Sequence, residues 1–119
     1  MRGLISLIGH THIDVAWLWQ LKDTVRKCGH TFTNMLRLMD EFPDFTFSCS
    51  QLQLMDYTKR YYPAVFEQIK ERVRDGRWEC VGPMWVESDC NVVSGESLVR
   101  QLIYGINFAE KEFGTHSHV

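Results

Sequence analysis

Apolar residues in this chain occur either in short continuous runs or at intervals of three and four positions. The short runs, which are typical of strands covered on both faces, lie at 4–9, 45–49 and 77–82. The spaced segments, which have the period of a helix with one buried face, lie at 23–42, 52–75 and 94–113. The pattern therefore predicts the element order β-α-β-α-β-α.

Residues near the ends of the predicted helices fit helix starts and stops. Asp23 and Ser94 are expected to cap the first and last helices, because their side-chain oxygens can accept from free backbone N–H groups. Pro63 fits the first turn of a renewed helical segment. Gly76 is expected to take a left-handed conformation after the middle segment, and Gly114 to close the last helix.

Large apolar side chains at helical spacing define the faces that the first and last helices are expected to bury. In the first helix they are Val25, Cys28, Phe32, Met35, Met39 and Phe42. In the last helix they are Leu98, Leu102, Ile106, Ala109 and Phe113. Each set forms one stripe that can pack against a sheet.

Strands that alternate with helices imply parallel pairing through right-handed crossovers. The sequence therefore predicts an α/β fold, in the form of a partial parallel βαβαβα segment. Three strands complete neither an open sheet nor a barrel, so residues 1–119 are expected to be the beginning of a larger domain. His116–Val119 is expected to approach a further strand.

Composition narrows the class of partner. A content of 45% hydrophobic residues in 119 is that of a single folded domain. The formal net charge of −2 provides no attraction to nucleic acid or to an anionic membrane. Because no apolar stretch approaches the ~20 residues of a membrane span, we expect neither nucleic acid nor a membrane as partner.

The four cysteines form no CxxC pair, so their spacing does not favour a thiolate zinc site. Free thiols and a sparse set of disulfides are both compatible with it. Free thiols are favoured because Cys28, Cys49 and Cys80 stand where small buried residues would fit. Free thiols in turn predict a cytoplasmic location.

The loop after the first predicted strand carries candidate metal ligands. His12 and Asp14 are two residues apart, so in an extended segment both side chains point the same way. One nitrogen and one oxygen donor suit zinc or a similar divalent ion. His10 falls on the same side, as a further ligand or a hydrogen-bond donor. The competing interpretation is that both histidines serve only as hydrogen-bond partners in the loop. Trp17, a flat aromatic beside this polar cluster, suits the apolar face of a sugar, although it could also be a core residue.

The loop after the third predicted strand is expected to meet the first loop at the same end of the sheet. Asp89 in this loop is a candidate third metal ligand, and the competing interpretation is a carboxylate that caps a turn. Glu87 is expected to be solvated or to act as a hydrogen-bond partner. Two polar loops that converge at a strand end are what a metal site needs.

Five segments, which follow one another along nearly the whole chain, resemble glycoside hydrolase family 38, the α-mannosidases. The segments are Gly9–Trp19, Phe47–Gln51, Gly76–Glu79, Met84–Asn91 and Ser94–Gln101. Within the family the chain is most similar to the bacterial cytoplasmic type. The resemblance implies that residues 1–119 are the incomplete amino-terminal portion of an α/β-barrel catalytic domain.

The resemblance also implies a function, namely a metal-dependent retaining α-mannosidase that hydrolyses terminal α-mannosides of oligosaccharides or glycosides. His12, Asp14 and Asp89 match the family's zinc ligands, Asp89 matches its catalytic nucleophile, and Trp17 matches a residue of the mannose subsite. The family's remaining histidine ligand and its general acid/base have no counterpart here, so the 119-residue chain alone is expected to be inactive. A homo-oligomer is a further expectation, because an incomplete sheet leaves an edge that can pair.

Two alternatives accompany this hypothesis. A metal-dependent amidohydrolase barrel also carries a His-x-His pair after its first strand, but it explains neither Asp14 and Trp17 after that pair nor the loop around Asp89. A non-catalytic module that binds sugar or metal is the second alternative. Metal binding by the longer protein without hydrolysis of mannosides would favour that module.

Overall fold

The computed structural model describes residues 3–114 of the chain. The strands in this range are β1 (Gly9–Thr11), β2 (Phe47–Cys49) and β3 (Trp78–Cys80). The helices are α1 (Leu21–Glu41), α2 (Leu52–Tyr61), α3 (Pro63–Arg74) and α4 (Gly95–Phe113). Among the described residues, no helix is long and apolar enough to cross a membrane.

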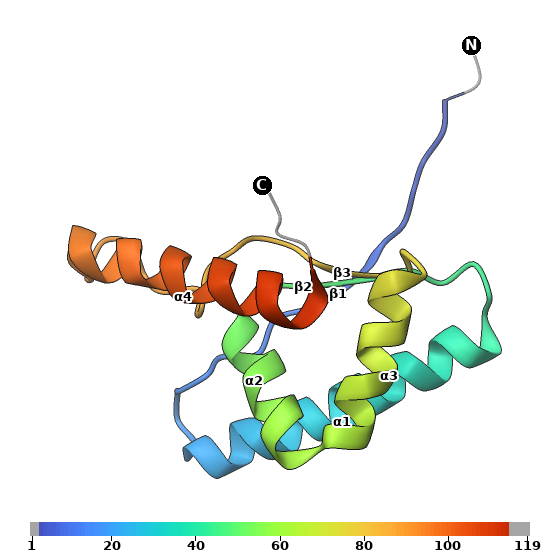
Figure 1. Cartoon of the computed structure of the whole chain (residues 1–119), viewed down its shortest axis with the longest axis horizontal. Coiled ribbons are helices and arrows are strands. Elements are labelled where there is room, and N and C mark those ends of the chain that lie inside the picture. The colour runs from blue at the N-terminus through green and yellow to red at the C-terminus, as the bar shows by residue number, and fades with distance from the viewer. Residues whose placement is uncertain (1–2, 115–119) are drawn as a thin grey trace.

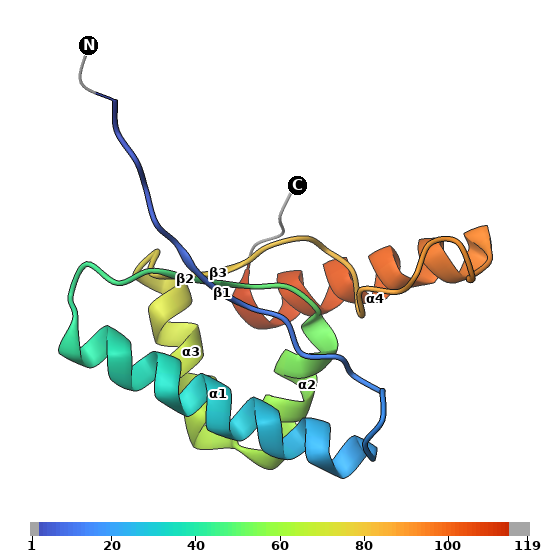
Figure 2. The same ribbon diagram turned by 180° about the vertical axis from the view of Figure 1, so that it is seen from behind.

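The strands form one parallel sheet in the order β1-β2-β3, which confirms the predicted α/β class. Gly9, Phe47 and Trp78 are aligned across it, so all three carboxyl ends lie at the same edge. Figure 1 shows α1, α2 and α3 on one side of the sheet, with α4 running beside the loop that follows β3. The view from behind shows the same arrangement (Figure 2).

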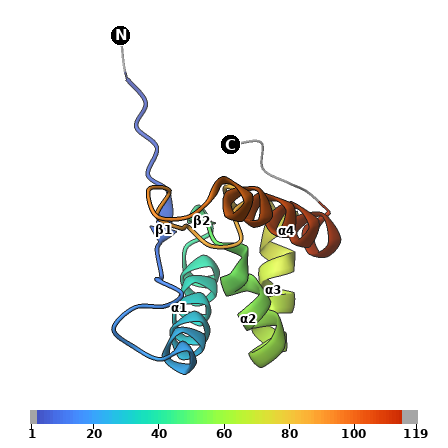
Figure 3. The same cartoon turned by 90° about the vertical axis from the view of Figure 1, so that its left-hand side faces the viewer.

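The strand predicted at 4–9 is wrong in position, since β1 begins only at Gly9. Residues 3–8 extend away from the sheet (Figure 3). Leu4 and Leu7 are 93% and 91% exposed. A strand is defined by its partner, and β2 pairs with the first segment only through Gly9–Thr11. The strand predicted at His116–Val119 lies outside the described residues.

The first helix begins earlier than its predicted cap. Gln20 is the N-cap residue of α1, and Asp23 lies three positions further on, where its carboxylate accepts from the Gln20 backbone N–H at 3.3 Å. Cys28, Phe32 and Met39 are buried as predicted. Phe42 is 51% exposed, contrary to the prediction, because the helix ends at Glu41 and this residue has left the helical face.

Arg77, just before β3, closes the carboxyl end of α1. Its guanidinium donates to the carbonyls of Met39 at 2.7 Å and Phe42 at 2.9 Å, and also to the carbonyl of Phe45. No basic side chain stands in the last turn of α1 itself. The free carbonyls of this helix end are therefore satisfied by a cation from a distant part of the sequence.

The predicted ends of the other helices are confirmed. Pro63 is the first residue of α3, and Gly76 after this helix has a positive φ of 70°. The Ser94 hydroxyl accepts from the backbone N–H of Ser97 at 3.2 Å and so caps α4. Gly114 ends α4 with a φ of 69°. These signals are local, so the sequence is sufficient to place them.

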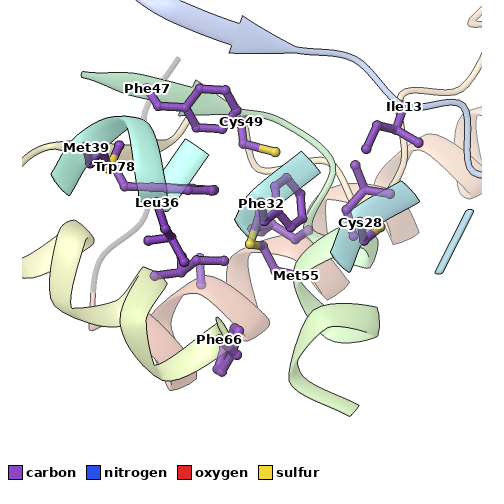
Figure 4. Packing of buried hydrophobic residues seen from close by; sticks show 14 residues of the cluster. Ile13, Cys28, Phe32, Leu36, Met39, Phe47, Cys49, Met55, Phe66 and Trp78 are labelled. Atoms are coloured by element: carbon purple, nitrogen blue, oxygen red, sulfur yellow. The ribbon is translucent and has the colours of Figure 1, made fainter. Parts of the chain in front are cut away.

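Aromatic side chains form the centre of the core between the sheet and the helices (Figure 4). The Trp78 ring lies edge-on to Phe47 of the neighbouring strand, with centroids 4.6 Å apart, and to Phe32 of α1 at 5.5 Å. All three side chains are at most 1% exposed. Such edge-to-face contacts add to the free energy gained by burying the apolar area.

The last helix docks through a glycine rather than through its whole apolar stripe. Ala109 is buried as predicted, but Leu102 is 41% exposed, so the predicted stripe is partly wrong. Gly105 is buried, and a Cβ at this position would lie 1.6 Å from the carbonyl oxygen of Pro83. The backbone of the loop after β3 therefore passes directly against α4, and its place depends on a residue without a side chain.

We expect Gly105→Ala to destabilise the chain by about 1–3 kcal/mol, the usual cost of overpacking, although alanine favours helix by about 1 kcal/mol over glycine. Gly95→Ala is the matched control, because no atom lies within 4 Å of its Cβ position. Urea unfolding of both variants measures the difference. Equal stability of the two variants would contradict the close packing of α4.

The four cysteines lie in the described part of the chain and are free. Burial raises the pKa of the Cys28 thiol to about 12 and that of Cys49 well above its usual value. Because only the thiolate reacts with alkylating reagents, we expect exposed Cys90 to be labelled at pH 8 long before Cys28 and Cys49. Mass spectrometry of timed samples, with Cys90→Ser as control, checks this. Labelling of Cys28 at the rate of Cys90 would contradict the packing of α1.

Candidate functional site

The loops that follow β1, β2 and β3 meet at the carboxyl edge of the sheet. His12 stands directly after β1, Gln51 two residues after β2, and Glu87 in the long loop between β3 and α4. Side-chain contacts link the three residues. This edge is where parallel α/β folds form their ligand sites.

The imidazole of His12 lies between two carboxylates. Its Nε2 is 2.9 Å from Oδ1 of Asp14, and its Nδ1 is 2.6 Å from Oε2 of Glu87. The hydrogen bond to Asp14 is the largest cause that raises the pKa of His12 above 6.5. Burial opposes this rise, and Glu87 adds to it through hydrogen bonding and charge. The side chains of His12 and Asp14 are 50% and 40% exposed, so a ligand can reach both.

Gln51 connects the first loop to the third from a buried position. The residue is only 3% exposed, and its amide nitrogen donates to the Ile13 carbonyl at 3.2 Å. Its amide oxygen accepts from the backbone N–H of Glu87 at 3.4 Å. Gln51 has a φ of +66°, the one positive φ of a non-glycine residue in the described range. Such left-handed residues are uncommon, and they concentrate at functional sites.

The loop that carries Glu87 is held by two helices. The Trp85 indole donates to Gln53 of α2 at 2.6 Å, and the Gln53 backbone N–H donates to the Trp85 carbonyl at 2.9 Å. The backbone N–H of Trp85 donates to the Gln101 carbonyl of α4 at 3.0 Å, and that of Val86 to the Gln101 side chain at 2.8 Å. Glu87 therefore extends from an anchored segment.

Asp89 makes only local contacts. Its Oδ1 accepts from the backbone N–H of Asn91 at 2.9 Å, and its carbonyl accepts from that of Val92. The side chain is exposed, and its contact matches the turn-capping interpretation. Among residues 3–114, no three histidine, cysteine or acidic side chains are placed to hold a metal ion. The structure thus pairs His12 with Asp14, but it does not bring Asp89 to them.

The donor chemistry of the pair fits a divalent metal. A histidine nitrogen and a carboxylate oxygen that lie side by side and partly exposed are the kind of ligands that zinc binds. The described residues supply two such donors at one place, which is fewer than a complete site. The role predicted for Asp89 stays a prediction.

His10 contacts the neighbouring strand. Its Nδ1 lies 3.1 Å from both the carbonyl oxygen and the hydroxyl of Ser48, which faces it in the sheet register. The predicted hydrogen-bonding role of His10 is therefore confirmed, and its partner is Ser48.

Two tryptophans lie at the margin of the site. Trp17 is 64% exposed and lies edge-on to Trp19, with ring centroids 5.5 Å apart. Trp19 is fixed by its indole N–H, which donates to Thr24 at 2.9 Å, and by the ammonium group of Lys27 at 4.5 Å from its ring. A shallow pocket of about 230 Å³ next to them is lined by Thr11, His12, Ile13, Asp14, Trp19, Lys27 and Thr31. Trp17 is thus available for contact with a ligand rather than packed in the core.

The sequence does not assign functional roles to Gln51 and Glu87. Glu87 is expected there only to be solvated or to be a hydrogen-bond partner, and the structure confirms the second of these. Gln51 stands at the end of one of the motif segments, but no spacing argument connects it to His12 or Glu87. Only the folded chain brings the three loops together.

Comparison with known proteins assigns the family. Residues 2–119 match the model described as "Glycosyl hydrolases family 38 N-terminal domain". The chain is 47% identical over 107 residues to alpha-mannosidase G of Dictyostelium discoideum, covering 90% of this chain and 10% of that protein. It is 46% identical over 110 residues to alpha-mannosidase 2C1 of Homo sapiens, covering 92% of this chain and 11% of that protein. The chain belongs to glycosyl hydrolase family 38, which confirms the resemblance of its motifs.

The fold has a similar counterpart among solved structures. The crystal structure of an alpha-mannosidase from Enterococcus faecalis V583 matches with a TM-score of 0.78 at 25% identity, covering 87% of this chain and 12% of that one. The chain spans 10% and 11% of the length of the two curated relatives above. The family match supports the mannosidase hypothesis over the amidohydrolase hypothesis.

Proposed function

We propose that the protein is a metal-dependent retaining α-mannosidase that hydrolyses terminal mannose residues from oligosaccharides or glycosides. Membership of glycosyl hydrolase family 38 and two relatives named alpha-mannosidase support the reaction class. The observation that carries the proposal for this chain is the contact between His12 and Asp14 at the carboxyl end of β1. The adjacent nitrogen and oxygen donors support a site for an ion that orients the sugar.

His12 and Asp14 would hold zinc or a similar divalent ion, with Asp89 as a third ligand. When bound, such an ion polarises the sugar hydroxyls and orients the ring. The Asp89 carboxylate is proposed to attack the anomeric carbon and form a covalent glycosyl ester as the glycosidic bond breaks. The departing oxygen takes its proton from a general acid, and water then hydrolyses the ester.

The exposed ring of Trp17 is proposed to stack on the apolar face of the mannose. Trp17 lies edge-on against Trp19, whose indole N–H donates to Thr24. This contact holds the exposed ring of Trp17 in place. An aromatic surface of this kind holds a sugar without needing to match its hydroxyl pattern. The hydroxyls are then left for the polar groups of the site.

The proposal also covers the fold of the catalytic domain and the cellular compartment in which the protein acts. We propose that the three parallel strands belong to an α/β barrel, and that the protein acts in the cytoplasm. The parallel order β1-β2-β3 supports the barrel, and the free, buried thiols of Cys28 and Cys49 support a reducing compartment. In the described part of the chain β1 is an edge strand, and this edge supports pairing with further strands or with a second copy.

Asp89→Asn in the longest reading frame tests the nucleophile. We expect loss of zinc-dependent hydrolysis of an aryl α-mannoside by a factor on the order of 10³ or more, because an amide cannot form the glycosyl ester. The substrate's released phenol is measured by absorbance. Asp44→Asn, which changes an exposed aspartate after α1, is the matched control and should retain full activity.

A metal-loaded protein inert on every α-mannoside would contradict the proposed function and favour a binding module. Full activity of Asp89→Asn would instead show that another residue is the nucleophile. We expect no turnover by the 119-residue chain alone, because the family resemblance matches none of its residues to the general acid/base. Measurable hydrolysis by the purified monomer would contradict this.

A further inference from the structure

We propose that Glu87 and Gln51 are positioning residues for His12, with Glu87 holding the imidazole in the tautomer that carries its hydrogen on Nδ1. Nε2 is then the atom presented to Asp14 and to a metal ion. The presentation of Nε2 to a metal rests on the proposed function, whereas the tautomer of His12 rests only on the contacts among the three loops.

The contact between His12 and Glu87 decides where the hydrogen lies. Nδ1 and Oε2 are 2.6 Å apart, the length of a strong, charge-assisted hydrogen bond. Ionised carboxylates can only accept, so Glu87 favours a hydrogen on Nδ1 and Asp14 favours one on Nε2. A neutral imidazole carries only one hydrogen, and the shorter contact, to Glu87, favours Nδ1. The amide nitrogen of Gln51 lies 3.4 Å from the same nitrogen of His12. It donates instead to the Ile13 carbonyl, which is closer at 3.2 Å.

The choice at Nδ1 fixes what the other nitrogen can do. A neutral imidazole with its hydrogen on Nδ1 has a lone pair on Nε2. When His12 is protonated, its Nε2–H donates to Asp14, which is why this contact raises the pKa of His12. In the neutral form the lone pair faces Oδ1 of Asp14 at 2.9 Å, so two acceptor atoms lie side by side. Two acceptors in this arrangement are stabilised by a cation that both can bind. Glu87 thereby prepares the pair of His12 and Asp14 as a cation ligand.

Gln51 places Glu87 relative to His12. Its amide oxygen accepts from the backbone N–H of Glu87, and its amide nitrogen donates to Ile13, the residue after His12. One side chain thus spans the loops after β1 and β3 from the end of β2. Its left-handed backbone is a conformation that few residues other than glycine adopt. Glutamine at such a position is explained by the two loops that its amide connects.

The tautomer is measured directly by NMR. Long-range ¹H–¹⁵N spectra of the chain with ¹⁵N-labelled histidine, recorded at a pH where His12 is neutral, distinguish hydrogen on Nδ1 from hydrogen on Nε2. We expect the Nδ1 form in the parent chain. In Glu87→Ala the Nε2 form, which an unconstrained imidazole prefers, should predominate.

Glu87→Gln, which keeps the shape of the side chain, provides a second test in case Glu87→Ala does not fold. Its amide can donate as well as accept, so we expect a mixture of both tautomers. Glu71→Ala, which changes an exposed glutamate of α3, is the matched control and should retain the Nδ1 form. The proposal is overturned if the parent carries its hydrogen on Nε2, or if Glu87→Gln and Glu87→Ala both leave the Nδ1 form unchanged.

Zinc affinity, measured by competition with a chromophoric chelator in the longer protein, provides the second measurement. We expect Glu87→Ala to weaken it about 10–100-fold, the usual effect of removing a group that orients a histidine ligand. Gln51→Gly, which keeps the left-handed backbone but removes the amide, should weaken it in the same direction. A parent that binds no zinc but shows the expected tautomers would contradict the proposed function and leave the positioning role of Glu87 supported. If neither variant changes the zinc affinity, Glu87 and Gln51 do not orient His12 for the metal, and this part of the proposal is overturned.

Discussion

The amide of Gln51 is the interaction on which the arrangement of this site depends. Parallel strands bring three chain segments to one edge, but strand pairing alone does not set the positions of the loops beyond it. Gln51 connects the loop of Ile13 to the loop of Glu87 through one buried side chain. Its φ of +66° shows that the chain adopts an unfavourable backbone at this position. The contacts of the amide give a physical reason for that conformation.

The loop after β3 connects this site to the packing of the helices. Gln101 of α4 accepts from the backbone N–H groups of Trp85 and Val86, and Gly105 lets the chain at Pro83 lie against the same helix. Gln53 of α2 holds the Trp85 indole from the other side. A change in how α4 docks would therefore move Glu87 relative to His12. Stability of the helical layer and geometry of the site are coupled through one loop.

The sequence predicts most features that depend on neighbouring residues, although it places the cap of α1 at Asp23 instead of Gln20. It misses features that depend on distant residues. The cap at Ser94 and the left-handed Gly76 are local, and both were predictable. The strand predicted at 4–9 fails because only pairing with β2 decides where β1 begins. His12 and Asp14 were predictable as neighbours because two residues separate them. The link from His12 to Glu87 crosses 75 positions, and no periodicity encodes it.

We propose that His12 presents Nε2 to a metal because Glu87 occupies Nδ1. The decisive measurement is a crystal structure of the longer protein with zinc, with anomalous data at the zinc edge. We expect a zinc peak at Nε2 of His12 and the Asp14 carboxylate, with Glu87 on Nδ1. A zinc ion on Nδ1, or a Glu87 side chain directed away from His12 while zinc is bound, would contradict it.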